Sequence, residues 1–153
     1  MTQVWNILHV LAMFIAFAFT TGTGIYLTAL SKSGDVRVIR TATSVAGPLL
    51  NAGTVLLVLG ILFGVATAGA IGFSMSSKWL LITYFLVVLL LVVGVGVHRM
   101  WEARLRRAAL ASPDDDASPE LRNVIEDRGV MIAGPVSGLL WVAIIALMIL
   151  RPM

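Results

Sequence analysis

Residues 79–98 read WLLITYFLVVLLLVVGVGVH, and this stretch decides the fold class of the chain. It contains no acidic residue, no lysine and no arginine. A helix needs about 20 mostly apolar residues to cross the hydrocarbon core of a bilayer, and this stretch is long enough. Its apolar residues are continuous and do not alternate with polar ones, which excludes a strand of a transmembrane β-barrel. We therefore predict a membrane-spanning α-helix over residues 79–98.

Three further stretches of the 153-residue chain have the same apolar character. They cover residues 4–30, 42–73 and 130–150. The sequence thus predicts an all-α, polytopic membrane protein with four transmembrane helices that form a single domain over residues 1–153. No basic side chain precedes the first stretch, and its apolar run is longer than that of a signal peptide. We expect it to be retained as a helix.

The composition agrees with a membrane protein and excludes several other classes. Hydrophobic residues make up 59% of the chain, charged residues make up 12%, and the mean hydropathy is +0.97. An average soluble domain is about 25% charged. A soluble enzyme and a disordered chain are therefore excluded. Because the chain contains no cysteine, a disulfide scaffold and a cysteine-ligated metal or iron–sulfur site are excluded as well.

The basic residues are sorted between the two sides of the predicted membrane domain. Two of the eleven, Lys78 and Arg151, lie on the side that holds both termini, and nine lie in the loops on the other side. These nine are Lys32, Arg37, Arg40, Arg99, Arg104, Arg106, Arg107, Arg122 and Arg128. The positive-inside rule then places the loop at residues 99–129 in the cytoplasm and both termini outside. Membrane topology accounts for the basic excess, so no nucleic-acid partner is predicted.

Local patterns refine this topology at the two membrane surfaces. Trp5 and Trp79 are expected in the outer aromatic belt and Trp101 in the inner one. We expect residues 99–110 to continue the third helix as a basic amphipathic extension. Ser118-Pro119-Glu120 has the form of a helix N-terminus, and a short helix should follow it. The loop as a whole is either a solvated connection or a docking surface for a partner.

The four spans show an internal repeat. The first contains Gly22-x-Gly24 and the third contains Gly94-x-Gly96, while Ala46-Gly47-Pro48 and Ala133-Gly134-Pro135 open the second and fourth. We interpret this pattern as a duplicated helical hairpin, and hence as a parallel repeat about an axis along the membrane normal. Both prolines are expected in or near the first turn or two of their helices, where the early N–H groups have no helical partner.

Small residues also predict where helices pack. In lipid, close approach of backbones replaces the hydrophobic drive between helices, and glycine permits it. Gly60-x-x-x-Gly64 makes such a stripe on the second helix. The stripe faces either another helix of the same bundle or a second copy of the chain. Gly22, Gly24, Gly94 and Gly96 are further candidates for close packing.

Few side chains within the spans can carry chemistry. No carboxylate lies in any span, which argues against a relay of paired acids and against the usual kind of cation-coupled transporter. His9 lies in the outer third of the first helix, and Met13 is on the same helix face. The outer end also holds Lys78. Imidazole with a thioether suits haem iron or Cu(I). His9 is therefore the predicted metal ligand, and Met13 and Lys78 join it as cofactor-binding candidates.

The alternative for His9 is an interfacial histidine bonded to a backbone carbonyl or a lipid headgroup. His98 ends the third helix beside Arg99 and is interpreted as a residue at the headgroup level. Along the membrane normal, His9 and His98 should lie roughly 20 Å apart, at 1.5 Å per residue. That separation excludes the pair as two axial ligands of one haem.

The opening of the chain resembles a superfamily of small bacterial membrane proteins. Residues 5–12 read WNILHVLA, with a histidine in the first helix; Lys78-Trp79-Leu80 opens the third helix, and His98 with a basic stretch ends it. The superfamily includes HemJ-type protoporphyrinogen oxidases, CopD-like copper-resistance domains and a family of predicted integral membrane proteins of unknown function. The resemblance implies a four-helix fold in a bacterial cytoplasmic membrane.

The resemblance also implies a cofactor. In the HemJ type, a first-helix histidine is linked to haem b and acts with a third-helix lysine, and His9 matches that histidine. The HemJ lysine follows the Trp-Leu pair, near the position of Thr83, whereas Lys78 precedes Trp79. The chain is therefore most similar to the family of unknown function.

Three functional hypotheses follow from the sequence. The first is a haem b protein that uses His9 near the outer face for electron transfer or tetrapyrrole handling. The second is a non-catalytic accessory subunit of a larger membrane complex, for example a respiratory one, and the third is copper handling at the outer face by His9 and Met13. All three place the protein in the lipid bilayer with membrane subunits or copies of itself as partners.

Overall fold

The computed structural model describes residues 2–150, and the predicted outer-side Arg151 lies outside the described residues. This part of the chain is helical and contains no strand. Four of its helical stretches, Thr2–Ser31, Val36–Ala70, Lys78–Ala111 and Pro119–Leu150, are long and apolar enough to cross a membrane. The all-α fold with four candidate spans is therefore confirmed.

Two of the spans are interrupted by short π-helical segments. The first consists of α1 (Thr2–Phe17), η1 (Ala18–Gly22) and α2 (Thr23–Ser31), and the third of α4 (Lys78–Leu90), η2 (Leu91–Val97) and α5 (His98–Ala111). The second span is α3 (Val36–Ala70), and the fourth is α7 (Arg128–Leu150), which follows the short α6 (Pro119–Ile125). The π-helical segments fall at corresponding places of the proposed repeat.

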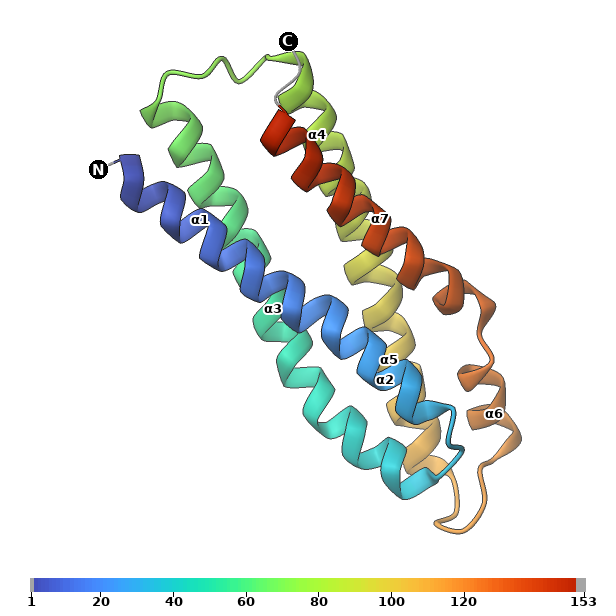
Figure 1. Cartoon of the computed structure of the whole chain (residues 1–153). Coiled ribbons are helices and arrows are strands. Elements are labelled where there is room, and N and C mark those ends of the chain that lie inside the picture. The colour runs from blue at the N-terminus through green and yellow to red at the C-terminus, as the bar shows by residue number, and fades with distance from the viewer. Residues whose placement is uncertain (1, 151–153) are drawn as a thin grey trace.

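The helices form two antiparallel pairs (Figure 1). The first span packs along α3, and α4 with η2 packs along α7. The start of α1 and the end of α7 lie at one end of the molecule, and α6 lies at the other end with the connection between α2 and α3. The pairs meet mainly through α3 and α5 in the half nearest α6. We call this the inner half, because its charges predict a cytoplasmic location, and the other the outer half.

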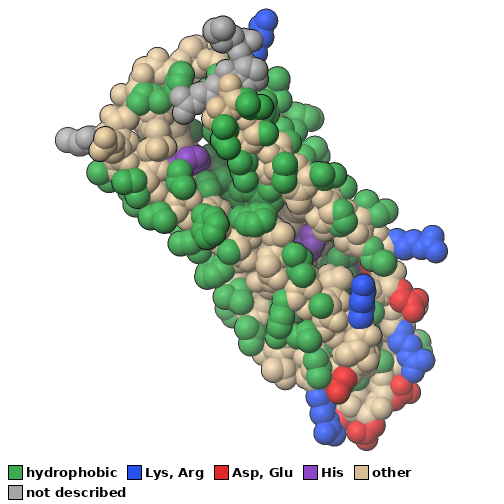
Figure 2. Space-filling model, viewed as in Figure 1, with side chains coloured by type: hydrophobic (Ala, Val, Ile, Leu, Met, Phe, Trp, Pro, Cys, Tyr) green, Lys and Arg blue, Asp and Glu red, His purple; other side chains and the backbone are tan. Residues whose placement is uncertain are grey.

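Charged side chains gather at the inner end of the molecule, where red and blue groups are mixed (Figure 2). Elsewhere the visible surface consists of green apolar side chains among tan backbone and other groups, with a basic side chain at the opposite end. Large hydrophobic side chains such as Phe14, Phe85 and Leu139 are each about 70% exposed, as the lipid-facing surface of a membrane protein requires. The sorting of charge matches the predicted topology, and the assignment of this end to the cytoplasm stays a prediction.

The second span begins earlier than its apolar pattern predicts. Its first residue is Val36 instead of Ala42, because the Asp35 side chain caps the helix by accepting hydrogen bonds from the backbone N–H groups of Arg37 and Val38. The expectation that Pro48 lies in or near the first two turns is therefore wrong. Pro48 lies well inside α3.

The third span continues past the apolar stretch to Ala111, and the expected basic extension is confirmed.

Trp101 does not lie in an aromatic belt, which corrects that expectation. Its side chain is only 2% exposed, and Nε1 donates a hydrogen bond of 2.9 Å to the carbonyl of Val124. The short loop helix is confirmed too, since the Ser118 side chain accepts a hydrogen bond from the N–H of Leu121.

An inner core holds the two pairs together at the charged end. It contains Leu27 from α2, Ile39 from α3, Leu105 from α5 and Leu121 from α6, all at most 2% exposed. Burial of one such side chain contributes about 1.5–3 kcal/mol relative to exposure to water. This part of the molecule thus has the packed core of a small soluble helical domain.

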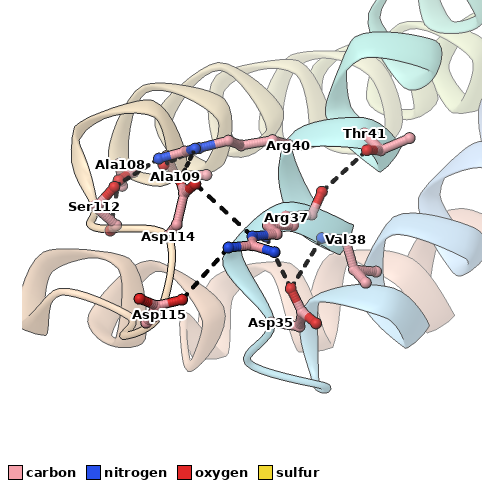
Figure 3. A network of polar contacts seen from close by, with 10 residues as sticks. All are labelled: Asp35, Arg37, Val38, Arg40, Thr41, Ala108, Ala109, Ser112, Asp114 and Asp115. Atoms are coloured by element: carbon pink, nitrogen blue, oxygen red, sulfur yellow. Dashed lines mark hydrogen bonds and ion pairs between the residues drawn. The ribbon is translucent and has the colours of Figure 1, made fainter.

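A polar network ties the end of α5 to the start of α3 (Figure 3). The Arg40 guanidinium donates to the carbonyls of Ala109 at 2.9 Å and Ser112 at 2.6 Å, and it pairs with Asp114 at 2.5 Å. The carbonyls belong to the last turn of a helix, where no helical N–H is available. Arg37 lies beside Arg40 but is exposed, and its ion pairs with Asp114 and Asp115 are 3.8 and 3.5 Å long.

We expect Arg40→Met to lower the free energy of unfolding by about 2 kcal/mol, because it removes three charge-assisted bonds and keeps the aliphatic stem. Arg37→Met is the matched control and should cost less than about 1 kcal/mol, since exposed ion pairs contribute little. Denaturant titration in detergent micelles measures both. Equal losses for the two variants would show that Arg40 does not anchor the end of α5.

Candidate functional site

The face of α3 that meets the first span is built from glycines. A Cβ added at Gly53 would lie 2.9 Å from Thr20 Cγ2, and one at Gly60 would lie 2.6 Å from Met13 Sδ. At Gly64 it would lie 2.9 Å from the His9 ring. A side chain at these positions would therefore require the Thr20, Met13 or His9 side chain to shift. The Gly60–Gly64 stripe therefore faces another helix of the same chain, and it is not a free surface for a second copy.

His9 lies half-buried on α1 with its ring against this glycine stripe. Its Nδ1 is 2.7 Å from the carbonyl oxygen of Gly60. A carbonyl oxygen only accepts, so Nδ1 must carry the proton and donate it. In the neutral ring the Nε2 atom then has a free lone pair. A bond to a backbone carbonyl is what the alternative interpretation of His9 predicts, and the same bond also leaves Nε2 free to bind a metal, with the ring oriented by the carbonyl.

The other two predicted cofactor ligands are placed differently. Met13 lies one turn after His9, but its sulfur packs against Gly60 in the contact between α1 and α3. Lys78 is exposed at the start of α4, which packs against α7 and not along α1. The structure thus brings Met13 to the same helix contact as His9 and leaves Lys78 on another helix pair. Among residues 2–150, no group of three or more His, Cys, Asp or Glu side chains could hold a metal ion.

The glycines of the repeat have different surroundings. A Cβ at Gly24 would lie 3.1 Å from His98 Cδ2, and one at Gly94 would lie 3.1 Å from Ser137 Oγ, so both permit close helix contacts. Gly96 has only an ordinary contact at 3.7 Å, with the carbonyl of Leu91 in its own helix. Gly22 has nothing within 4 Å. Close packing therefore accounts for Gly24 and Gly94 but not for Gly22 and Gly96.

A cavity of about 490 Å³ lies between the first, third and fourth spans. Both π-helical segments border it, through Thr20 and Thr21 of η1 and through Gly94 and Val95 of η2. π-helical turns inside α-helices are frequent at functional sites, because the wider turn displaces side chains from the regular helical positions. The sequence contains no signal for this cavity, since it depends on the local helix geometry.

His98 lines the cavity, which corrects its interpretation as a headgroup-level residue. Its side chain is only 9% exposed, and its ring packs against Gly24. The buried Nδ1 has no hydrogen-bond partner of normal geometry among the described residues. One turn further along α5, Glu102 Oε1 is also buried without a partner, near Gly47 of α3. The sequence did contain one signal for these two buried groups. His98 and Glu102 are four residues apart at the end of an apolar stretch, which places them on the same face of a helix.

The two histidines thus mark two separate sites. Figure 2 shows them as separate purple patches on one face of the molecule. His9 presents an oriented imidazole in the outer half, between α1 and α3. His98 borders a cavity in the inner half, together with Trp141, whose ring is 4% exposed. The first site is suited to ligate a metal, and the second is suited to enclose a small apolar molecule with a few polar groups.

We expect Gly64→Ala to displace the His9 ring, because the new Cβ would lie 2.9 Å from Cε1 and Nδ1. Overpacking should lower the free energy of unfolding of the variant by about 1–3 kcal/mol. It should also weaken the hydrogen bond between His9 Nδ1 and the Gly60 carbonyl. The measurements are thermal unfolding and the ¹⁵N chemical shift of His9 Nδ1. Gly69→Ala on the same helix is the control, since a Cβ there has nothing within 4 Å. An unchanged ring shift in Gly64→Ala would contradict the packing of His9 on Gly64.

Comparison with known proteins places the chain in one family. No curated protein and no solved structure matches it significantly. The family described as predicted integral membrane proteins and designated DUF2269 matches residues 3–152, nearly the entire sequence. This agrees with the four apolar helices of the structure and with the family of unknown function that the sequence resembles. The chain therefore belongs to the DUF2269 family of predicted integral membrane proteins.

Proposed function

We propose that this membrane protein binds haem b through His9 and serves electron transfer or tetrapyrrole handling. The observation that carries the proposal is the hydrogen bond from His9 Nδ1 to the Gly60 carbonyl. It holds the ring in one tautomer and directs the lone pair of Nε2 away from that carbonyl. The likeness of the first helix to that of the HemJ type adds support, because the matching histidine there is linked to haem b.

The surroundings of His9 fit a porphyrin. Gly60 and Gly64 allow the imidazole to lie against α3, and this contact limits its rotation. Figure 2 shows an apolar recess between the outer halves of the two helix pairs, and apolar surface suits the faces of a macrocycle. A haem b held there would supply one-electron chemistry. The chain would contribute Nε2 of His9 as the ligand atom, held in one orientation by the hydrogen bond to Gly60, and apolar surroundings.

Copper binding at the outer face is supported less well. A site for Cu(I) would need the sulfur of Met13 beside the free Nε2 of His9. The sulfur instead contacts Gly60 in the contact between α1 and α3. The accessory-subunit hypothesis predicts a different result. Other protein chains would co-purify with this protein under mild detergent.

We expect the protein, purified in detergent and mixed with haemin, to shift and intensify the Soret band of free haemin, and His9→Ala to abolish this change. Met13→Leu keeps the apolar packing and should retain the band, and so should His98→Ala, which changes the other histidine. His9→Gly should regain the band when free imidazole is added, because imidazole can replace the missing ligand. Absorption titration gives the haem stoichiometry for each variant.

The same titration can refute the proposal. A Soret band of equal intensity and position in His9→Ala would exclude His9 as the ligand. Thermal unfolding of each variant without haem shows whether a lost band reflects a lost ligand or a lost fold.

A further inference from the structure

We propose that the cavity beside His98 binds a hydroquinone, a hydroxyl-bearing aromatic ring with an apolar tail. The site is distinct from His9, and the proposal does not depend on haem binding. It rests on the shape of the cavity, on the polar atoms along its wall and on its two flat side chains.

The shape of the cavity requires a long and mostly apolar ligand. The wall follows the first span from Thr20 to Lys32, which is about 18 Å at 1.5 Å per residue. Leu57 and Leu90 line it deeper in the molecule. With a volume of about 490 Å³, the cavity is large enough for a substituted ring and the first part of a tail. Exposed Lys32 marks its inner end.

Three hydroxyl oxygens of the wall are acceptors, whereas Lys32 at the inner end is a donor. The hydroxyls of Thr20, Thr28 and Ser137 donate their protons to the carbonyls of Ala16, Gly24 and Ala133, at 2.7, 2.8 and 2.7 Å. Each hydroxyl oxygen keeps a lone pair that can accept another hydrogen bond. A ligand that satisfies them must itself carry hydroxyl or N–H donors. An anionic headgroup, which only accepts, would find no partner at these oxygens, and its one cationic partner in the lining would be Lys32 at the inner end.

His98 adds a further hydrogen-bonding group. Its buried Nδ1 has no hydrogen-bond partner among the described residues. The ring packs against Gly24, which also lines the cavity, so a side chain at position 24 would displace it. In the neutral tautomer that carries the proton on Nδ1, Nε2 has a lone pair that can accept a hydrogen bond from a ligand hydroxyl.

Two planar side chains favour an aromatic ring over a hydroxylated lipid headgroup. The ring of Trp141 lines the cavity and is held by an edge contact with Phe17, with ring centroids 5.3 Å apart. The imidazole of His98 is the second planar group. Flat rings stack on such side chains, whereas a glycerol headgroup does not. The observations therefore favour a hydroquinone over a phospholipid.

The chain offers variants that fill the cavity without disturbing the fold. Gly134 and Gly138 of α7 both line the cavity, and a Cβ at either position has nothing within 4 Å. In Gly134→Leu and Gly138→Leu the new side chain can enter the empty space. Gly69→Leu is the matched control, because Gly69 also has open space around it and does not line the cavity.

The experiment measures binding of decylubiquinol and decylubiquinone to the full chain in lipid nanodiscs, with protein-free nanodiscs as the blank. We expect saturable binding of decylubiquinol, with the oxidised form binding at least about fivefold more weakly because it cannot donate hydrogen bonds. Gly134→Leu and Gly138→Leu should abolish saturable binding, and Gly69→Leu should not change it. His98→Leu should weaken binding about tenfold. The thermal midpoint of each variant identifies any that fails to fold.

Three results would overturn the proposal. The first is decylubiquinol binding that persists in both cavity-filling variants. The second is oxidised and reduced forms that bind equally tightly, since this would contradict an acceptor-lined wall. The third is a phospholipid recovered from the purified protein by mass spectrometry that decylubiquinol does not displace, which would assign the cavity to a structural lipid.

Discussion

The contact between α1 and α3 is the interaction on which much of the outer half depends. In lipid, helices gain little from burying apolar side chains against each other, so association relies on close van der Waals packing. Gly53, Gly60 and Gly64 supply that closeness. The same contact brings the His9 ring to the Gly60 carbonyl and sets its tautomer. The glycines therefore determine both how closely α1 packs against α3 and which nitrogen of His9 carries the proton.

The inner half is stabilised in a different way. There the helices extend beyond the apolar stretches, and they are joined by a buried apolar core and by the Arg40 network. Contacts between the two helix pairs are concentrated in this half. The molecule is thus built as a domain with a water-facing end, from which two less closely joined pairs extend into the membrane. The cavity lies where these two kinds of packing meet.

The sequence predicted the number and approximate position of the spans, because long uncharged stretches have few other uses. It did not predict that α3 begins at Val36, because Arg37, Arg40 and Thr41 interrupt the apolar pattern before Ala42. The helix begins at the cap that Asp35 provides. Hydropathy likewise cannot tell a Trp101 at a lipid interface from one buried under a loop helix. The start of α3 is set by a local cap that hydropathy does not register, whereas the burial of Trp101 depends on contacts with residues distant in the chain.

The candidate sites were predicted to different degrees. His9 was found because an ionisable side chain inside an apolar stretch is conspicuous, although its bond to Gly60 depends on how α1 packs. His98 was assigned to the headgroup level, because its neighbour is Arg99 and its position was judged from the helix end alone. Its burial depends on η2, and π-helical turns have no reliable sequence pattern.

The π-helical segments also affect how the protein tolerates changes in length. An α-helix turns by about 100° per residue, so removing one residue rotates everything after it by that angle. A π-helical turn holds an additional residue, and a deletion within η1 or η2 could be absorbed by a return to α-helical geometry. The flanking α-helical segments would then keep their faces, while the local wall of the cavity would be rebuilt. Single-residue deletions at these two segments would thus alter the cavity selectively, whereas the same deletion in α3 would turn the glycine stripe away from α1.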